Sequence, residues 1–144
     1  MMKHTKLMKE RIRRVRVLFK ELGYNFKESE IHENSYSAGF EYKEEFIGGI
    51  YIDKDSKFME IAFSFSFSSH LGSFIQNKLE DMLRTCYEFG CYLNLFNAEE
   101  EIAFSVFSKI YYVGLNFYSL KETIKDFQLC VDSIKDIIKF EDDE

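Results

Sequence analysis

The sequence contains 144 residues, of which 46% are hydrophobic and 17% aromatic, and its formal net charge at pH 7 is −6. This length suits one domain with one core, and the apolar content is too high for a disordered chain. No stretch approaches the roughly 18 uncharged residues of a membrane-spanning helix, and the charged N-terminus lacks the apolar core of a signal peptide. We therefore expect a cytoplasmic protein without a membrane span, folded as a single domain over residues 1–144.

The first predicted element is a basic helix over residues 1–22. Its hydrophobic residues recur at spacings of four and three, which places them on one stripe: Met8, Ile12, Val15, Phe19 and Leu22. Gly23 follows, and glycine most readily takes the left-handed conformation just after a helix. The helix is therefore expected to end before Gly23.

Over residues 24–68 the hydrophobic period changes to two, which is typical of a β-meander. The predicted strands are 35–42, 46–53 and 59–67, and the predicted turns are 43–45 and 53–57. An additional edge strand over residues 24–32 is an open alternative, against which the polar side chains Lys27, Glu28, Glu30 and His32 count. The pattern thus predicts three antiparallel strands.

The second half of the chain is expected to contain two helices with a β-hairpin between them. Helical spacing covers residues 73–89 and 119–140, and a period of two covers residues 91–113. Ser73 with Gln76, and Ser119 with Glu122, match the capping-box pattern at the two helix starts. The sequence therefore predicts an α+β fold of order α-β-β-β-α-β-β-α, with about five antiparallel strands and helices packed on one face of the sheet.

No constellation of catalytic or metal-binding residues is recognisable. The histidines lie in three separate segments, at His4, His32 and His70. None has a cysteine or carboxylate at ligand spacing, and no nucleophile elbow or phosphate-loop pattern occurs. The three cysteines lie in apolar segments and are predicted to be thiols of the core: Cys86, Cys91 and Cys130. We therefore expect no enzymatic activity, no metal and no cofactor.

Two short motifs have structural rather than chemical interpretations. Gly48-Gly49 within a strand pattern indicates a bulge or a close backbone approach. Asp53-Lys54-Asp55 resembles the start of a calcium loop, but Phe58 stands where that loop needs glycine. The second motif is therefore predicted to be a turn.

Charge is distributed unevenly along the chain. Residues 1–20 contain eight Lys or Arg residues and one Glu, which gives +7, so the remaining 124 residues carry −13 of the total of −6. The basic helix could bind nucleic acid, lie on a membrane surface, dock on its own acidic domain or attract an acidic protein. The pI of about 5.2 makes nucleic acid the less favoured partner. The candidate partner-binding residues here are Arg11, Arg13, Arg14 and Arg16.

A second candidate surface is a sheet face with small side chains. Small residues alternate with aromatic or aliphatic ones on two predicted strands, at Ala62, Ser64, Ser66, Ala103 and Ser105. Such a face is open to pairing or helix docking, and simple solvent exposure is the equal alternative. Tyr111 lies in an aromatic-rich segment and is a further candidate anchor, because tyrosine offers a large contact area at low entropic cost.

The order of elements resembles the type III secretion chaperone-like fold, which includes the YbjN-like family of uncharacterised bacterial proteins. The resemblance covers nearly the whole chain and rests on the order of elements, the small size, the acidic balance and the second half of the chain. There a helix leads into residues 91–97 (Cys-Tyr-Leu-Asn-Leu-Phe-Asn), followed by a long strand to Val113 and a helix from Ser119. It implies a dimerising or partner-binding module that holds a segment of another protein, with no catalytic residues and no cofactor.

The function that we expect is therefore that of a non-catalytic protein-binding module, either chaperone-like or an adaptor, and we also expect a homodimer. An immunity protein that neutralises a bacterial toxin is an alternative, because a small acidic protein suits a basic toxin. A nucleic-acid-associated regulator acting through the basic helix is a further alternative. An enzyme would need a pocket with convergent titratable groups.

Overall fold

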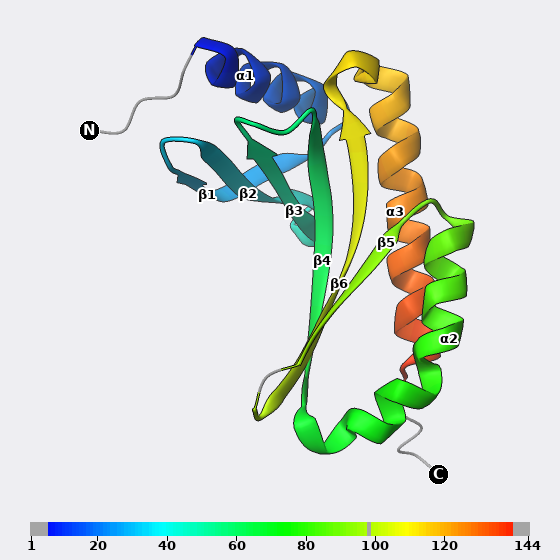
Figure 1. The fold of residues 1–144 in the computed structure, drawn as a ribbon. Helices are drawn as coiled ribbons and strands as arrows, with labels where there is room; N and C mark the ends of the chain where they lie inside the picture. Colours follow the sequence, from blue (N-terminus) through cyan, green and yellow to red (C-terminus); the bar gives the residue numbers. More distant parts are fainter. Residues whose placement is uncertain (1–5, 98, 140–144) are drawn as a thin grey trace. The chain divides into compact units, whose positions relative to one another are not determined.

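The computed structural model describes residues 6–97 and 99–139 and confirms the α+β class. Figure 1 shows the order of its helices and strands. Their bounds are α1 (Lys6–Glu21), β1 (Asn25–Ile31), β2 (Ser35–Tyr42), β3 (Glu45–Asp53), β4 (Phe58–Ser68), α2 (Gly72–Glu88), β5 (Tyr92–Asn97), β6 (Glu101–Tyr111) and α3 (Phe117–Ile137). Short 3-10 turns, Ser69–Leu71 and Tyr112–Gly114, precede α2 and α3. Among these described residues, no helix is both long and apolar enough to cross a membrane.

Residue contacts divide the chain into two compact units, each built from two segments. The first unit comprises Met1–Ala62 with Lys109–Lys125, and the second comprises Phe63–Ser108 with Asp126–Glu144. β4, β6 and α3 each continue from one unit into the other, so no single point in the sequence separates the units. The six described strands follow the order β1-β2-β3-β4-β6-β5 in the sheet.

An aromatic cluster joins α1 to the strands of the first unit. The buried ring of Phe19 lies edge-on to Phe26 and Phe40, with centroid distances of 5.2 and 5.0 Å. Tyr24 packs edge-on against Phe40 at 5.5 Å. Edge-to-face pairs contribute about 0.5–1.5 kcal/mol each beyond their buried area. The predicted stripe of α1 is thus the face that it buries, with Met8 and Val15 fully enclosed.

Two helices end at glycines in the left-handed conformation. Gly23, with φ of 95°, follows α1, and Gly90, with φ of 70°, follows α2. After α1, the Tyr24 amide donates to the Phe19 carbonyl and the Gly23 amide donates to the Lys20 carbonyl. These two bonds satisfy carbonyls that the helix leaves without a partner, in the Schellman arrangement. The predicted end of the first helix is confirmed.

The described residues form six strands, one more than the five or so predicted. β1 pairs antiparallel with β2, so the order of elements is α-β-β-β-β-α-β-β-α. Its charged residues do not prevent pairing, because an outer strand can place alternate side chains in solvent. Phe26 packs on Phe19, whereas the Lys27 side chain is exposed and lies 3.9 Å from Glu41. The register shifts between Lys27 and Glu30, as expected at an irregular sheet edge.

The turn between β2 and β3 and the glycine pair within β3 have the predicted roles. Lys43 and Glu44 both have positive φ, as a two-residue hairpin turn of type I′ requires. Phe40 pairs with Gly48 and Glu41 with Phe46, which leaves Ile47 as the additional residue of a bulge. A Cβ on Gly49 would lie 2.9 Å from the Tyr51 hydroxyl, so this glycine makes room for a ring that lies along the strand.

The core of the second unit surrounds β6. Phe104 and Val106 are buried, together with residues of the two helices: Ile75, Met82, Cys86, Phe127, Cys130, Val131 and Ile134. The Phe65 ring stacks on Phe104 at 4.8 Å. The predicted hydrophobic face of β4 is fully buried only at its start, at Met59 and Ile61. In the second unit Phe63, Phe65 and Phe67 are half-buried, because their rings pack on one another and on Phe104 without being enclosed.

Neither predicted capping box forms. α2 begins at Gly72 and its N-cap, Leu71, makes no side-chain capping bond, so Ser73 already lies within the helix. In α3 the cap is Asn116: its Oδ1 accepts from the Ser119 amide at 2.9 Å, and Ser119 Oγ accepts from the Asn116 amide at 3.0 Å. Asparagine is an equally good N-cap, and the serine three residues later takes the returning role usually given to Glu or Gln. The predicted end of α3 at residue 140 lies outside the described residues.

Candidate binding site on the sheet

Three of the four candidate arginines bind within their own unit. Arg16 Nη1 donates to the Tyr36 hydroxyl at 3.2 Å, and Arg14 donates to the carbonyls of Leu115 and, at 3.2 Å, Tyr112. Arg13 differs, because it points into solvent and pairs at 2.7 Å with Glu10 on the same helix. That contact lowers the pKa of Glu10. The Arg13 side chain is 64% exposed and is accessible to a partner.

Arg11 fixes the turn between β3 and β4. Its Nη1 donates to the carbonyls of Ser56, Lys54 and Asp53 at 3.0, 3.2 and 3.4 Å. Its guanidinium lies 4.2 Å from the centroid of the Tyr112 ring, at cation–π distance. The Asp55 amide also donates to Asp53 Oδ1 at 2.9 Å. Asp53-Lys54-Asp55 is therefore a turn, as predicted.

The small-residue face is brought together only in part. Ser64 and Ser105 share a hydrogen bond of 2.8 Å in the second unit, and Ser66 there donates to Glu101. Ala103 lies on the same side of β6 as Ser105 and is half-buried. Ala62 belongs to the first unit and is buried, so it offers no contact surface. Tyr111, also in the first unit, is 51% exposed and packs edge-on against Phe58.

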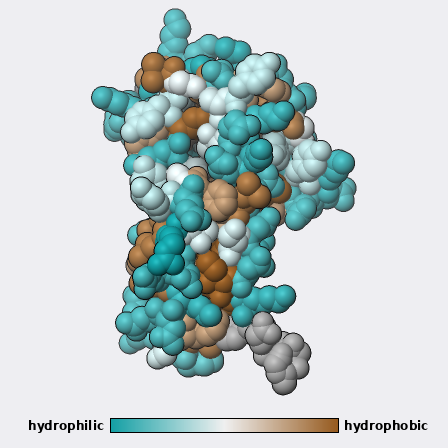
Figure 2. Space-filling view, turned by 90° about the vertical axis from the view of Figure 1, so that its right-hand side faces the viewer, coloured by the Kyte–Doolittle hydropathy of each residue, from teal (hydrophilic) through white to brown (hydrophobic). Residues whose placement is uncertain are grey.

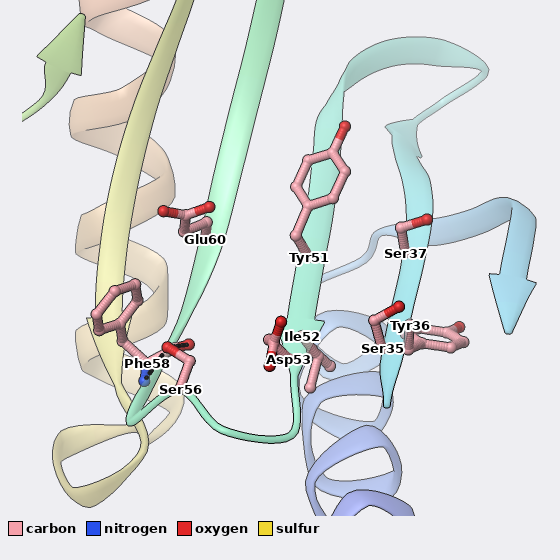
Figure 3. Close-up of a pocket in the computed structure, with 9 residues that line it drawn as sticks. All are labelled: Ser35, Tyr36, Ser37, Tyr51, Ile52, Asp53, Ser56, Phe58 and Glu60. Carbon is pink, nitrogen blue, oxygen red and sulfur yellow. Dashed lines mark hydrogen bonds between the residues drawn. The ribbon is translucent and has the colours of Figure 1, made fainter. Parts of the chain in front are cut away.

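A pocket of about 420 Å³ opens on the sheet of the first unit, and the sequence did not predict it. Figure 3 shows the side chains that line it, which come from β2, β3, the following turn and β4. They are Ser35, Tyr36, Ser37, Tyr51, Ile52, Asp53, Ser56, Phe58 and Glu60. We call this hollow the sheet pocket.

Strand alternation explains why these side chains meet. Ser35 pairs with Asp53 across β2 and β3, Ser37 pairs with Tyr51, and Tyr51 pairs with Glu60 on β4. Directly paired residues lie on the same face of an antiparallel sheet. The residue between Ser35 and Ser37 is the buried Tyr36, whose hydroxyl binds Arg16 of α1. The sheet pocket thus lies on the face opposite α1, which Figure 3 shows behind the strands.

The sheet pocket combines negative charge with aromatic surface. Asp53 and Glu60 supply carboxylates, while Tyr51 and Phe58 supply rings that are exposed or half-buried. Phe58 already faces one cation, because Lys109 Nζ lies 4.5 Å from the centroid of its ring. Carboxylates beside aromatic rings favour a Lys or Arg side chain, through ionic, hydrogen-bonding and cation–π contacts. The serine hydroxyls can both donate to and accept from a peptide backbone.

A second hollow, of about 310 Å³, lies in the second unit and is mainly apolar. It is lined by Gly72, Ile75, Gln76, Leu79, Leu95, Asn97 and Ile102. Figure 2 views the molecule from the side on which α2 and α3 are drawn in Figure 1 and shows hydrophobic side chains reaching a largely hydrophilic surface. This hollow contains no charged group and offers only shape and apolar contact.

The three cysteines meet in the second unit and are buried, as predicted. Cys130 Sγ lies 3.8 Å from Cys86 Sγ, and Cys91 Sγ lies 3.3 Å from Ser108 Oγ. A hydrogen bond from Cys130 lowers the pKa of Cys91 to about 7 against the opposing effect of burial. The bonds that Cys130 makes to the other two thiols raise its own pKa. The cluster is part of the core, and its sulfurs are enclosed.

The described residues contain no group of three or more His, Cys, Asp and Glu side chains placed to hold a metal ion. His32 lies 3.6 Å from the exposed Glu30, and His70 Nδ1 lies 2.7 Å from the Ser68 hydroxyl. Neither histidine lines the sheet pocket. The groups that the sheet pocket presents are carboxylates, hydroxyls and aromatic rings.

Comparison with known proteins finds a solved structure with a similar fold and does not identify a family. No family model matches the chain, and no curated protein matches it. A crystal structure of an uncharacterised protein from Methanothermobacter thermautotrophicus is similar, with a TM-score of 0.70 and 18% sequence identity. The match covers 88% of this chain and 95% of that protein. At this identity the similarity shows a shared fold.

The signal for the sheet pocket is present in the sequence. Three strands each carry a polar–apolar–polar or aromatic–apolar–polar triplet: Ser35-Tyr36-Ser37, Tyr51-Ile52-Asp53 and Phe58-Met59-Glu60. The outer residues of each triplet lie on one face, and the middle residue points to the core. What the sequence lacks is the register that places the three triplets side by side.

Proposed function

We propose that this protein is a non-catalytic, chaperone-like or adaptor module that holds a segment of a partner protein in the sheet pocket. The observation that carries the proposal is the convergence of two carboxylates, two aromatic rings and serine hydroxyls on a face opposite α1. We further propose that the segment places a Lys or Arg side chain between Asp53 and Glu60. The acidic remainder of the chain, with −13 outside the first 20 residues, would attract such a basic segment.

Two features favour a protein partner over nucleic acid. Arg11, Arg14 and Arg16 already donate to groups of their own unit, so part of the donor capacity of these guanidinium groups is used within the protein. The sheet pocket is acidic and would repel phosphate. The predicted resemblance to the type III secretion chaperone-like fold agrees with a partner-holding role, and we retain its implication of a homodimer as part of the proposal.

The proposal is tested by selecting binders from a displayed library of random, unstructured peptides. We expect enrichment of peptides that contain Arg or Lys, and we expect Glu60→Gln to weaken their binding by about tenfold, because a charge-assisted hydrogen bond is worth about 1.5–3 kcal/mol. Binding should also weaken as salt rises, because the pocket is open to solvent.

Glu88→Gln is the matched control, because it removes the same charge from an exposed helical position in the second unit. Enriched peptides without a basic residue, or equal binding by the two variants, would exclude the sheet pocket as the site. When a natural partner is captured afterwards, a toxin would favour the immunity-protein alternative.

A further inference from the structure

The outer strand β5 combines an apolar sequence with an exposed position. It is the last strand in the sheet order and has one strand neighbour, β6, among the described residues. Its residues, Tyr92–Asn97, include no charged side chain. Tyr92, Leu95 and Phe96 are 50%, 47% and 62% exposed. An uncharged, apolar edge strand of this kind is a template for pairing with another chain.

The opposite edge of the sheet is different. β1 contains Lys27 and Glu30, and its register with β2 is interrupted between them. Charged side chains and bulges are the usual means by which proteins prevent pairing at a sheet edge. The protein therefore protects one edge and leaves the other apolar.

Pairing with β6 assigns each β5 side chain to a face. Leu93 and Leu95 lie opposite Val106 and Phe104, which are buried. Tyr92, Asn94 and Phe96 lie on the other face, opposite residues that are only half-buried: Phe107, Ser105 and Ala103. One face of β5 thus presents two aromatic rings around Asn94, and the other presents two leucines.

This arrangement is symmetric about Asn94. Residues 92–96 read aromatic, Leu, Asn, Leu, aromatic. If a second copy of β5 pairs antiparallel about a twofold axis at Asn94, Tyr92 lies opposite Phe96 of the second copy, and Leu93 lies opposite its Leu95. A shift of one residue would place unlike faces together, because strand side chains alternate with a period of two. A shift of the axis to Leu93 or Leu95 would place an aromatic ring opposite Asn94.

We propose that β5 is the dimerisation edge of this protein and that its occupant is β5 of a second copy, paired antiparallel about Asn94. The inference rests on the proposed homodimer and is independent of the sheet pocket in the first unit. Uncharged strands can meet although each copy carries a net charge of −6, because no like charges are placed opposite one another.

The size of the contact sets its strength. A buried aromatic side chain contributes about 150–250 Å², and Tyr92 and Phe96 have only about half of their surface left to bury. Two such strands bury less than the roughly 1,200 Å² at which stable interfaces begin, which places the dimer among weak, transient complexes. We therefore expect a dissociation constant of about 1–100 μM, in the range of such contacts.

The test is sedimentation of the full chain at concentrations from about 1 to about 300 μM, which spans that range. The wild type should pass from monomer to dimer, and Phe96→Lys should weaken the dimer at least about tenfold, because an edge lysine opposes strand pairing and would replace the apolar contact between Phe96 and Tyr92 of the second copy. Tyr87→Lys is the matched control, because it introduces the same charge at an aromatic residue that is 85% exposed on α2. An unchanged circular dichroism spectrum and melting temperature will show that each variant folds.

A second variant, at Asn94, tests the register in which the two β5 strands pair. Asn94→Cys should form a disulfide-linked dimer with a mild oxidant such as diamide, whereas Tyr87→Cys should not. A monomeric wild type at every concentration would overturn both the homodimer and its surface. A dimer that survives Phe96→Lys and is not cross-linked through Asn94→Cys would leave the homodimer standing and exclude β5. Peptide binding by Phe96→Lys should be unchanged, which separates this result from the sheet pocket.

Discussion

At the scale of single residues, Tyr112 has a buried polar atom without a partner. Its hydroxyl oxygen makes no hydrogen bond within the described part of the chain, although its ring packs beneath Arg11. A buried polar group without a partner costs about 1–3 kcal/mol. We expect Tyr112→Phe to leave the free energy of unfolding unchanged or to raise it by about 1 kcal/mol, as measured by urea denaturation at pH 7. A loss of more than about 1 kcal/mol would show that the hydroxyl has a stabilising contact.

Tyr112 also makes the stability of the fold depend on pH above about pH 10. Burial raises the pKa of Tyr112 from 10.0 to about 12, an effect that the nearby Arg11 partly opposes and the nearby Asp53 reinforces. Above pH 10 the unfolded chain therefore loses this proton while the folded chain keeps it. The contribution that this raised pKa makes to the free energy of unfolding is complete below about pH 10, and it is lost as the pH rises to about 12. Tyr112→Phe should lose less stability than the wild type over this interval, whereas Tyr118→Phe, at a ring that is 76% exposed, should follow the wild type.

At the scale of elements, α1 is held to its unit by arginines, and two of them form a matched pair. Arg14 donates to the carbonyls of Tyr112 and Leu115, whereas the contact of Arg13 within the described residues is an exposed ion pair with Glu10. Charge-assisted hydrogen bonds to the backbone are worth about 1.5–3 kcal/mol, and exposed ion pairs about 0.2–1 kcal/mol. Arg14→Ala should therefore cost about 2 kcal/mol of stability and Arg13→Ala less than about 0.5 kcal/mol, in the same denaturation assay. Equal losses would contradict the docking role of Arg14.

The elements themselves were largely predictable, because their signals are local. The stripe through Met8, Val15 and Phe19 is buried, and Gly23 ends the helix with positive φ, so periodicity and one glycine were sufficient for α1. The capping boxes were wrong because a capping pattern does not determine where a helix begins: Asn116, one position before α3, makes the bond predicted for Ser119. The strand over residues 24–32 was left as an open alternative because its charged side chains counted against it. That objection applies to a strand with both faces buried, whereas β1 lies at the edge of the sheet.

At the scale of the whole molecule, the candidate site depends on register, which a single sequence does not encode locally. Tyr51 and Glu60 become neighbours through the pairing of β3 with β4, and Ser37 joins them through the pairing of β2 with β3. The bulge at Ile47 shifts that second pairing, and its position depends on how glycine and aromatic side chains pack across strands. The alternation could therefore identify outward residues but could not identify which of them meet.

The division of the molecule into two units predicts which fragments of the chain can fold by themselves. The first unit needs Lys109–Lys125 as well as Met1–Ala62. Arg14 binds carbonyls of Tyr112 and Leu115, and the Tyr112 amide donates to the Lys57 carbonyl. A fragment of residues 1–68 lacks these partners and leaves the apolar faces of its strands uncovered, so we expect it to show no cooperative thermal transition by circular dichroism. Adding the fragment 69–144 should restore a transition, because each unit draws on both pieces. A fragment 1–68 that melts cooperatively by itself would show that the N-terminal segment forms an independent domain.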